Sequence, residues 1–310
     1  MSASVKVSIC IPTYNNVSEV ERLLKSIYEQ EYQDFEVNIS DDSTNDEIAG
    51  LVMEYPQVNY IHNAVPYGHI FNWNAAIRMA KGEYIKIMFS DDWFTDNHSL
   101  GAFVALLDGN PDAMMAFSGS RQVMLDGQDI GQLHHVTSEN GMKAYDRHAS
   151  SEFIDNLEKD YRSLFLGNQI GAPSATIYRR GSSPALFDEQ SNWASDMFLY
   201  FDLLQINGQF AYTTKPLVSI GVHVNQYTES FSEKDMRIYN DYRYMYTKYH
   251  LNESRECRTY FAEKFIVKYN QGLKEAKTLG IETGLFMKTY LAELRESIRC
   301  FISSRLSGKQ

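Results

Sequence analysis

The regular alternation of apolar runs and amphipathic segments in the first 120 residues is the strongest constraint on the fold. The apolar runs are short, as buried strands are, and they cover Val5–Ile11, Phe35–Ser40, Val58–His62 and Glu83–Phe89. Between them apolar residues recur every three or four positions, which predicts helices at Val17–Gln30, Glu47–Tyr55 and Ile70–Ala80. This order of elements predicts an α/β domain in which helices flank a mostly parallel sheet.

The middle of the chain continues this mixed pattern, whereas its end is helical. Further strands are expected at Ala113–Ser118, Ser174–Arg179, Phe210–Thr213 and Leu217–Val222, and further helices at Ser151–Phe165 and Ser195–Ile206. Gly82 follows the third helix and is expected in the left-handed conformation that ends many helices. From about residue 230 onward the pattern is helical. We therefore expect an α/β domain at residues 1–229 and a helical region at residues 230–310.

Charge and cysteine content exclude several classes of protein. The chain carries 40 acidic and 29 basic residues, a net charge of −11, which argues against nucleic acid as a partner. Cys10, Cys257 and Cys300 lie far apart, so neither a disulfide framework nor a zinc site is indicated. There is no signal-like start and no apolar run of about 18 residues. The cytoplasm is therefore the expected location.

Two acidic pairs follow strands of the predicted sheet. Asp41-Asp42 comes after the second strand and Asp91-Asp92 after the fourth. Ligands of open α/β sheets bind outside the carboxyl ends of the strands. Two carboxylate pairs at that edge are costly unless protons, solvent or a metal compensate them. Mg²⁺ or Mn²⁺ favours oxygen ligands and often binds carboxylates together with substrate phosphates. The alternative is that each pair only caps the helix that follows it.

An ordered series of motifs resembles the family 2 glycosyltransferases, which have the GT-A fold. It covers about the first 95 residues, and a weaker likeness extends to about residue 227. The motifs are Val7–Asn16, Asp34–Val37, Asp41–Ser43, Gly68–Ala76, Ala80–Ile85 and Ser90–Asp92. The resemblance implies a nucleotide-binding half at residues 1–95 and an acceptor half at residues 96–229. The substrates that it implies are a nucleoside diphosphate sugar donor and a saccharide or lipid-linked saccharide acceptor.

The resemblance also assigns residues to the binding of the nucleotide sugar. They are Pro12, Thr13, Tyr14, Asn15, Asp42, Asn72, Asp91 and Asp92. Asp42 matches the carboxylate that accepts a hydrogen bond from the base, which favours uridine, thymidine or guanosine carriers, and we expect a UDP-sugar. Tyr14 is suited to stacking on the base, with a packing role as the alternative. Asn72 and Asn74 would orient the phosphates or the ribose, or serve only in packing and capping.

The Asp91-Asp92 pair resembles the metal and ribose motif of the family. Adjacent residues of a strand point to opposite faces, so we assign Asp92 to the metal and diphosphate and Asp91 to the ribose or donor sugar. Phe89 departs from the fullest form of the motif, which has an additional Asp at that position. His223 resembles a histidine near the end of the family domain that ligates the metal or bonds the diphosphate. A structural role for His223 is the alternative.

Asp196 matches the catalytic base of the family. The matching segment is Trp193–Leu199, in which Ser195 replaces a common Glu. The resemblance implies that Asp196 takes the proton of the acceptor hydroxyl as its oxygen attacks the anomeric carbon, which inverts that centre. The alternative is a charge placed at a helix N-terminus because the helix dipole favours it there.

Apolar stripes run along the helical end of the chain. Apolar and aromatic residues recur at steps of three and four between Met236 and Phe301. Such stripes predict packing onto the catalytic domain or a homo-oligomer interface. The segment Met287–Arg305 also carries Lys288, Arg295 and Arg299 beside apolar residues. It therefore admits peripheral contact with the inner face of the cell membrane.

Taken together, these patterns predict an inverting glycosyltransferase of surface-polysaccharide biosynthesis that depends on Mn²⁺ or Mg²⁺. One alternative is a catalytically inactive sugar-nucleotide-binding or scaffold protein, which the departures at Phe89 and Ser195 leave open. Another is a nucleotidyltransferase, although the glycine-rich and basic phosphate loop expected near its N-terminus is absent from this sequence.

Overall fold

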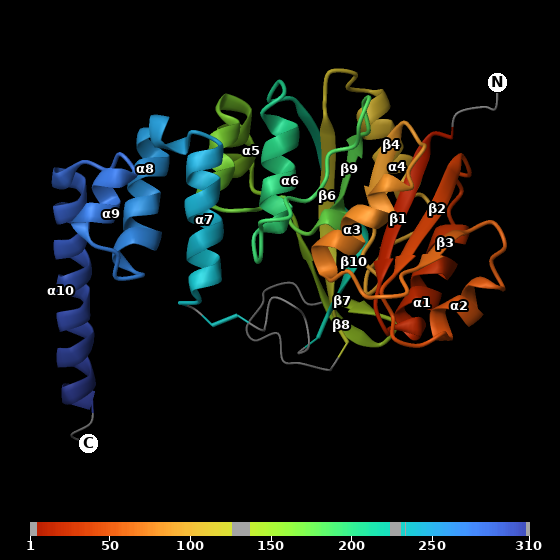
Figure 1. The fold of residues 1–310 in the computed structure, drawn as a ribbon, viewed down its shortest axis with the longest axis horizontal. Helices are drawn as coiled ribbons and strands as arrows, with labels where there is room; N and C mark the ends of the chain where they lie inside the picture. The colour runs from red at the N-terminus through yellow and green to blue at the C-terminus, as the bar shows by residue number, and fades with distance from the viewer. Residues whose placement is uncertain (1–4, 126–136, 224–230, 233, 308–310) are drawn as a thin grey trace. The chain divides into compact units, whose positions relative to one another are not determined.

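The computed structural model describes residues 5–125, 137–223, 231–232 and 234–307 (Figure 1). Contacts divide the chain into two compact units. The first unit comprises Met1–Tyr161, Asn168–Glu189 and Ser195–Glu229, and the second comprises Arg162–Gly167, Gln190–Ala194 and Ser230–Gln310. The expected boundary between residues 229 and 230 lies at the edge of a segment outside the described residues, so it stays a prediction.

The first unit alternates strands and helices along most of its length. Its elements are β1 (Val7–Thr13), α1 (Val17–Tyr28), β2 (Phe35–Asp41), α2 (Glu47–Val52), β3 (Asn59–His62), α3 (His69–Arg78), β4 (Tyr84–Ile87), β5 (Trp93–Phe94), α4 (Ser99–Asp108), β6 (Met115–Met124), β7 (Thr137–Glu139), β8 (Met142–Arg147), α5 (Ser151–Lys159), β9 (Thr176–Arg179), α6 (Ser195–Leu204) and β10 (Phe210–Val222). A 3₁₀ helix at Pro173–Ala175 precedes β9.

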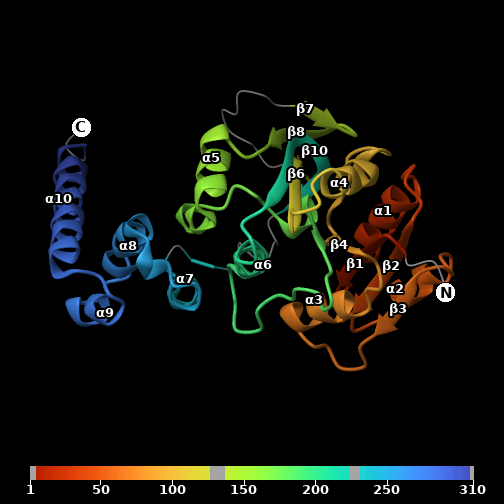
Figure 2. The ribbon, with the colours of Figure 1, turned by 90° about the horizontal axis from the view of Figure 1, so that it is seen from above.

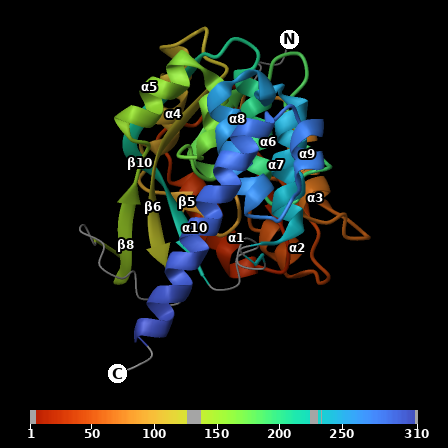
Figure 3. The same ribbon diagram turned by 90° about the vertical axis from the view of Figure 1, so that its left-hand side faces the viewer.

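One mixed sheet organises this unit. Its strand order is β3-β2-β1-β4-β9-β6-β10-β5, and β8 pairs with β6 and β7. The half built from β3, β2, β1 and β4 is parallel. Strand β9 then runs antiparallel to both of its neighbours, β4 and β6. Figure 3 shows β8 alongside β6, to which it is antiparallel. The predicted α/β class is confirmed, with antiparallel strands added on one side.

Helices cover both faces of the parallel half. In Figure 2, α1 and α4 lie on one side of β1 and β4, and α3 lies on the other. Strand β1 is buried along its whole length. Helix α1 buries Val20, Leu23, Leu24 and Ile27 against the sheet, as its spacing predicts. Each of these side chains contributes about 1.5–3 kcal/mol of hydrophobic stabilisation.

Gly82 does not adopt the left-handed conformation that its position after a helix predicts. A Cβ at this position would lie 2.6 Å from the backbone nitrogen of Ser8 and 2.8 Å from the Ser8 hydroxyl oxygen. Glycine is therefore required because the chain passes close to β1 at this point. The sequence cannot reveal such a contact, because Ser8 lies far from Gly82 along the chain.

Two expected elements differ in length. The helix expected at Ser151–Phe165 ends at Lys159, and after an extended Asp160 the chain forms a 3₁₀ helix at Tyr161–Leu166. The two short strands expected between Phe210 and Val222 form the single strand β10, whose pairing with β6 shifts register around Pro216. Proline has no N–H to donate to a neighbouring strand, so an irregular site is where a strand tolerates it.

Helices make up most of the described residues of the second unit, and Gln190–Ala194 forms a loop. Its main helices are α7 (Met236–Lys248), α8 (Arg255–Phe261), α9 (Leu273–Thr278) and α10 (Thr283–Ser307), with a π-helix at Ala262–Val267. Stacked aromatic rings form much of its interior. The ring centroids of Tyr242 and Phe265 lie 4.0 Å apart, and those of Tyr246 and Phe261 lie 4.4 Å apart. The aromatic residues that stand out in the sequence of this region therefore include core residues.

Asp241, on α7, is a buried carboxylate that holds a loop inside the second unit. It accepts hydrogen bonds from the backbone N–H groups of Asn192, Trp193 and Ala194, at 2.6–3.1 Å. The Asn192 side-chain amide donates to it as well. Several N–H donors to one carboxylate compensate for its burial, because each hydrogen bond to a charged group is worth about 1.5–3 kcal/mol.

Helix α10 exposes part of its apolar side. Met287, Tyr290, Leu291, Leu294 and Ile298 are each between 43% and 50% exposed. The side chains of residues 300–307, including Arg305, lie outside the described residues. Among the helices described, none combines the length and the apolar character that crossing a membrane requires.

Candidate active site

The register of β1 and β2 brings the first predicted site residues together. Thr13 pairs with Asp41 at the carboxyl ends of these parallel strands. The Asp41 carboxylate is buried and accepts hydrogen bonds from the Thr13 hydroxyl (3.0 Å), the Tyr60 hydroxyl (2.8 Å) and the Ser43 N–H (2.9 Å). Asp41 and the Thr13 side chain therefore hold the strand ends together, and the other carboxylate of the pair is the one left for a ligand.

Asp42 lies next to this pair and has different partners. Its two oxygens accept a hydrogen bond from the Gly68 N–H and one from the Asn63 side-chain amide, each at 2.8 Å. A carboxylate has about four acceptor positions, so these bonds leave acceptor capacity for a further N–H. The sequence offers no motif that points to Asn63, which the fold brings to Asp42 through the end of β3.

The two asparagines of α3 differ in their surroundings. The Asn72 amide donates to the Thr13 carbonyl at 3.0 Å, and its oxygen faces Asn63 at 3.3 Å. Asn74 is fully buried and forms two hydrogen bonds of 2.9 Å with the backbone of Phe187. Both ends of the Asn74 amide are thus bonded to backbone, while Asn72 lies among the residues around Asp42.

The loop after β1 carries the aromatic residue assigned to the base. Tyr14 is 57% exposed, as a stacking partner must be. Asn15 adopts a left-handed conformation, and its side-chain oxygen accepts a hydrogen bond from the Thr44 N–H at 3.0 Å. The loops after β1 and β2 are therefore tied to one another. Pro12 is buried inside β1 rather than exposed in the loop.

Asp91 and Asp92 occupy different environments, as their assignment to different roles requires. Asp91 is partly exposed, and its carboxylate lies 3.4 Å from His223 Nε2. Asp92 is buried and accepts a hydrogen bond from the Gly221 N–H at 3.3 Å. Burial first, and then the negative charge of Asp91, raise the pKa of Asp92 well above its usual value. The folded chain therefore favours the protonated, uncharged form of Asp92 when no cation is bound.

A fully buried lysine lies near Asp92. Lys86, on β4, donates to the Ser174 carbonyl, and its ammonium lies 4.5 Å from the centre of the Phe103 ring. The Ser174 side chain accepts a hydrogen bond from the Phe89 N–H at 2.9 Å and forms another with Asp92. Burial lowers the pKa of Lys86 well below its usual value, and the charge of Asp92 opposes that effect.

The residues at this strand end have the chemistry of a divalent-cation site. Carboxylate oxygens and an imidazole nitrogen suit Mn²⁺, and neighbouring ligands of one such ion lie about 3 Å apart. Asp91 and His223 meet that spacing. In the described part of the chain, however, there is no group of three or more His, Cys, Asp or Glu residues that could bind a metal ion by itself. Mg²⁺ usually binds through one or two carboxylates together with water and substrate phosphates.

Gly221 sets how closely β10 approaches the acidic pair. A Cβ at this position would lie 2.5 Å from the Asp91 carbonyl oxygen. This oxygen belongs to the backbone, so it cannot move away without displacing the chain around Asp91. We expect Gly221→Ala to lower the free energy of unfolding by about 1–3 kcal/mol and to weaken nucleotide binding through displacement of Asp91. Urea unfolding and a nucleotide titration measure both effects.

Gly50→Ala is the matched control for this substitution, because Gly50 lies in α2 with no atom within 4 Å of a built Cβ. Alanine at that position should leave nucleotide binding unchanged and keep or raise stability. Wild-type stability and binding in Gly221→Ala would show that the contact with Asp91 does not constrain the site.

Phe89, which replaces the additional Asp of the fullest family motif, belongs to an aromatic cluster. Its ring centroid lies 4.8 Å from that of Trp73, which in turn lies 4.9 Å from that of Phe187. This position therefore contributes an aromatic surface beside the acidic pair instead of a third carboxylate.

Asp196 lies in the first turn of α6 and is half-buried. Its Oδ2 accepts a hydrogen bond of 2.7 Å from the Asn168 side-chain amide, and its Oδ1 accepts one of 2.8 Å from the Met197 N–H. Burial raises the pKa of Asp196 to about 6, against the lowering effect of these hydrogen bonds. A carboxylate with a pKa near the working pH is suited to act as a general base.

One short segment connects the two acidic parts of the site. Asn168 bonds Asp196, and six residues later Ser174 bonds Asp92. Between them, Gly171 is left-handed, and its carbonyl accepts a hydrogen bond of 2.9 Å from the Tyr200 hydroxyl of α6. The resemblance places this stretch within the acceptor half at residues 96–229, and the structure gives it contacts to both carboxylates.

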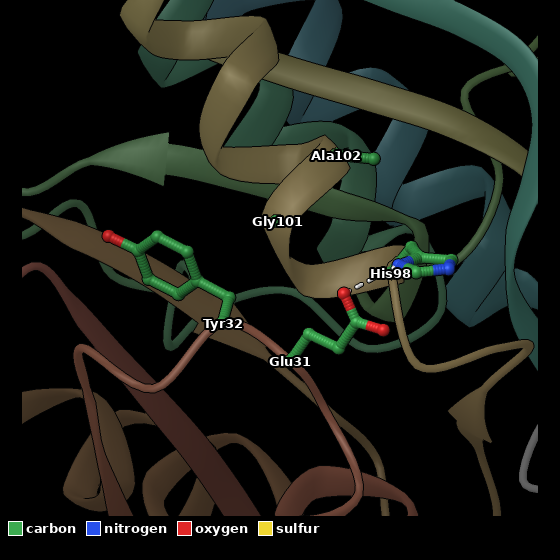
Figure 4. Close-up of a pocket in the computed structure, with 5 residues that line it drawn as sticks. All are labelled: Glu31, Tyr32, His98, Gly101 and Ala102. Carbon is green, nitrogen blue, oxygen red and sulfur yellow. Dashed lines mark ion pairs between the residues drawn. The ribbon is translucent and has the colours of Figure 1, made fainter.

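A pocket of about 450 Å³ lies away from these residues (Figure 4). It is lined by Glu31, Tyr32, His98, Gly101 and Ala102. Glu31 and Tyr32 precede β2, so this pocket lies toward the amino end of the strand whose carboxyl end carries Asp42. The ion pair between His98 and Glu31, at 3.1 Å, crosses it. None of the predicted site residues lines this pocket.

The mixed sheet and its acidic carboxyl edge define an α/β protein of the GT-A type. The profile described as Glycosyl transferase family 2 matches residues 8–187, which is more than half of the chain. The chain belongs to glycosyl transferase family 2.

Relatives and solved structures agree with this assignment. The chain is 34% identical over 227 residues to the abequosyltransferase RfbV of Salmonella typhimurium, an alignment that covers 68% of this chain and 65% of that protein. It is 27% identical over 92 residues to the GalNAc(5)-diNAcBac-PP-undecaprenol beta-1,3-glucosyltransferase of Campylobacter jejuni, an alignment that covers 28% of this chain and 30% of that protein. The chain thus spans less than two thirds of the length of either protein.

A solved structure has the same fold. It is S. aureus TarS 1-349 in complex with UDP-GlcNAc, with a TM-score of 0.60 and 16% identity over 92% of this chain and 79% of that one.

Proposed function

We propose that this protein transfers a sugar from a nucleoside diphosphate sugar to a hydroxyl group of a saccharide or lipid-linked saccharide, with inversion at the anomeric carbon. The observation that carries the proposal is the pairing of two sites through one segment. Ser174 contacts the acidic strand end at Asp92, and Asn168 contacts the half-buried Asp196. A donor site and a general base held by the same segment are what a direct displacement requires.

The donor is bound at the carboxyl ends of β1, β2 and β4. Asp42 accepts a hydrogen bond from the N–H on the pairing edge of the base, which favours a uridine, thymidine or guanosine carrier, and Tyr14 stacks on the ring. Thr13, Asn15 and Asn72 hold this loop, as their contacts with Asp41, Thr44 and Asn63 indicate. Asp91 bonds the ribose or the donor sugar. The complex of S. aureus TarS with UDP-GlcNAc supports a uridine donor on this fold.

Asp92 and His223 would hold Mn²⁺ or Mg²⁺, with Asp91 beside them. When bound, the cation neutralises charge on the departing diphosphate. The raised pKa of Asp92 supports this assignment, because a buried carboxylate next to another is stabilised by any positive charge that the substrate complex brings. His223 is close enough to Asp91 to share a ligand with it.

Asp196 acts as the base in the transfer step. As the acceptor oxygen forms a bond with the anomeric carbon, its proton moves to the Asp196 carboxylate, and the bond from the anomeric carbon to the diphosphate oxygen breaks. The electrons of that bond leave with the diphosphate. Attack from the face opposite the leaving group inverts the anomeric centre, and no covalent intermediate with the protein is needed.

The acceptor belongs to the biosynthesis of a bacterial surface polysaccharide. The name of the Campylobacter relative, which includes an undecaprenol-linked saccharide, supports the lipid-linked form of this acceptor. Residues 96–229 form the acceptor half. We assign acceptor specificity to the middle loops, such as Gly127–Ser150, and residues 126–136 lie outside the described residues.

A lipid-linked acceptor would place the protein in the cytoplasm at the inner face of the membrane. The exposed apolar stripe of α10 suits either peripheral membrane contact or a homo-oligomer. Sedimentation with and without anionic liposomes distinguishes the two. Pelleting with the liposomes supports membrane contact, whereas a concentration-dependent increase in mass supports self-association.

Donor hydrolysis tests the enzyme against the scaffold alternative. A panel of UDP-, GDP- and TDP-sugars is incubated with the protein, with and without Mn²⁺, and release of the nucleoside diphosphate is measured. An enzyme releases UDP slowly from one or a few donors in a Mn²⁺-dependent manner. Nucleotide binding without any release, in the presence of candidate acceptors, would instead support the inactive scaffold.

A further inference from the structure

Asn168 is the side chain that orients the carboxylate of Asp196. Its amide nitrogen lies 2.7 Å from Asp196 Oδ2, a short distance that is typical of a hydrogen bond to a charged acceptor. The same nitrogen lies 3.5 Å from the Gly171 carbonyl, a much weaker contact. Asn168 lies in an irregular segment 28 residues before Asp196, so only the fold brings the two together.

The orientation of the Asn168 amide is fixed by its own loop. Its side-chain oxygen accepts hydrogen bonds from the Ile170 N–H at 2.9 Å and the Gly171 N–H at 3.2 Å. Two backbone donors on one side identify the oxygen, so the NH₂ group must face Asp196. A flipped amide would lose these two bonds and place its oxygen against the carboxylate.

The backbone N–H groups of Met197 and Asp196 also bond this carboxylate, and two further side chains interact with its charge. The charge of Arg147 favours the ionised carboxylate, but this exposed guanidinium is bonded to the Asn168 carbonyl at 3.2 Å. Tyr200, one turn later on α6, interacts with the charge of Asp196 and donates its hydroxyl proton to Gly171. The Met197 N–H holds the other carboxylate oxygen.

We propose that Asn168 is a positioning residue for the general base, whose amide fixes one oxygen of Asp196 and favours the ionised carboxylate ready to accept the acceptor proton. This inference rests on the proposed function only for the role of Asp196. The geometry between the two side chains is independent of the identity of the donor or acceptor.

Removal of the amide should raise the pKa of Asp196 from about 6. A hydrogen bond to the charged form lowers a carboxyl pKa, so its loss in Asn168→Ala raises that pKa, by about one unit. The acidic limb of the pH profile of kcat should move to higher pH by the same amount, while KM for the donor changes little. In Asn168→Asp, which keeps the side-chain shape but adds a like charge, the shift should be larger.

A carboxyl ¹³C NMR titration of aspartate-labelled protein measures this pKa without any substrate. Asp196→Asn identifies the resonance of Asp196. Asn207→Ala is the matched control, because Asn207 also bonds backbone groups through both ends of its amide but contacts no carboxylate. We expect an upward shift in Asn168→Ala and Asn168→Asp and none in Asn207→Ala.

An unshifted Asp196 titration in both Asn168 variants would overturn the inference. If Asn168→Ala is unfolded by circular dichroism, the isosteric Asn168→Asp decides the outcome alone. The proposed function fails separately: if Asp196→Asn keeps its transfer rate while the Asn168 variants still shift the titration, the contact is real but Asp196 is not the base.

Discussion

Replacement of Asp196 by asparagine is expected to lower kcat for sugar transfer by about 10²–10⁴-fold, the range that a positioned general base supplies. The amide oxygen can still accept the Met197 N–H, so the first turn of α6 keeps its contact. An amide cannot take up the acceptor proton. KM for the donor should stay near the wild-type value, because the residues assigned to the donor are elsewhere.

The wild-type enzyme should also lose activity at low pH because of Asp196. Its pKa of about 6 means that the carboxylate becomes protonated as the pH falls through 6, so kcat should decrease about tenfold per unit below that point. The activity that remains in Asp196→Asn should not show this decrease in kcat below pH 6. Initial rates between pH 5 and 8 measure the difference.

As the pH falls, the effect of Asp196 on the free energy of unfolding should be opposite to its effect on kcat. The folded state raises the pKa of Asp196 above its value in the unfolded chain, so the ionised side chain costs stability at neutral pH. That cost is relieved as the pH falls from about 6 toward 4. The melting temperature of Asp196→Asn at pH 7 should therefore equal or exceed that of the wild type.

Asp202→Asn is the matched control on the same helix, since Asp202 contacts Gln205 at 3.3 Å and has no assigned role. Its transfer rate should equal that of the wild type. A positioned general base accelerates the reaction by at least about 10²-fold. If Asp196→Asn kept more than about a tenth of wild-type kcat, Asp196 would therefore not be the base.

Asp92→Asn is expected to lower transfer by about 10²–10³-fold, the usual loss when a group that stabilises developing charge is removed. The substitution keeps the shape of the side chain, and its oxygen can accept the Gly221 N–H. The side-chain NH₂ can donate to Ser174, which contacts Asp92 in the wild type. What is lost is one negative charge near the proposed cation.

Thermal stability should not fall with this loss of activity. Burial and the charge of Asp91 raise the pKa of Asp92, so the folded state disfavours its ionised form. An uncharged amide avoids that cost at neutral pH. We expect the melting temperature of Asp92→Asn without ligand to equal or exceed that of the wild type, and the stabilisation by UDP with Mn²⁺ to be lost.

The exposed Asp112 provides a control of equal charge change, and Asp112→Asn should retain both transfer and the Mn²⁺-dependent stabilisation. A destabilised Asp92→Asn with normal transfer would mean that Asp92 serves only the fold. That outcome would remove Asp92 from the cation site.

The sequence predicted the parts of the fold that local patterns determine. The spacing of Val20, Leu23, Leu24 and Ile27 predicted a helix with one buried side, and the structure confirms it. Apolar runs that end in acidic pairs predicted strands with a ligand site at their carboxyl ends, because parallel strands place these ends at one edge of the sheet. The strands β5, β7 and β8 were missed, because β5 has only two residues and the exposed strands β7 and β8 are mostly polar.

The partners of the site residues were beyond prediction because they are distant in sequence. Asn63 and Asn168 are ordinary polar residues in the sequence, and only the folded chain shows that they bond Asp42 and Asp196. Lys86 reads as a charged residue within an otherwise apolar strand, and the structure alone shows that it is buried near Asp92. The roles of the assigned site residues, including Asp196 and His223, remain predictions.

Nucleotide binding at the carboxyl edge of the sheet is the central claim, and a thermal-shift titration tests it most directly. UDP, GDP and ADP are each titrated, with and without Mn²⁺, against the wild type and Asp42→Asn. UDP with Mn²⁺ should raise the melting temperature of the wild type more than ADP does, and Asp42→Asn should lose that preference. Stabilisation by ADP alone, or equal stabilisation of the wild type and Asp42→Asn by UDP, would contradict the account.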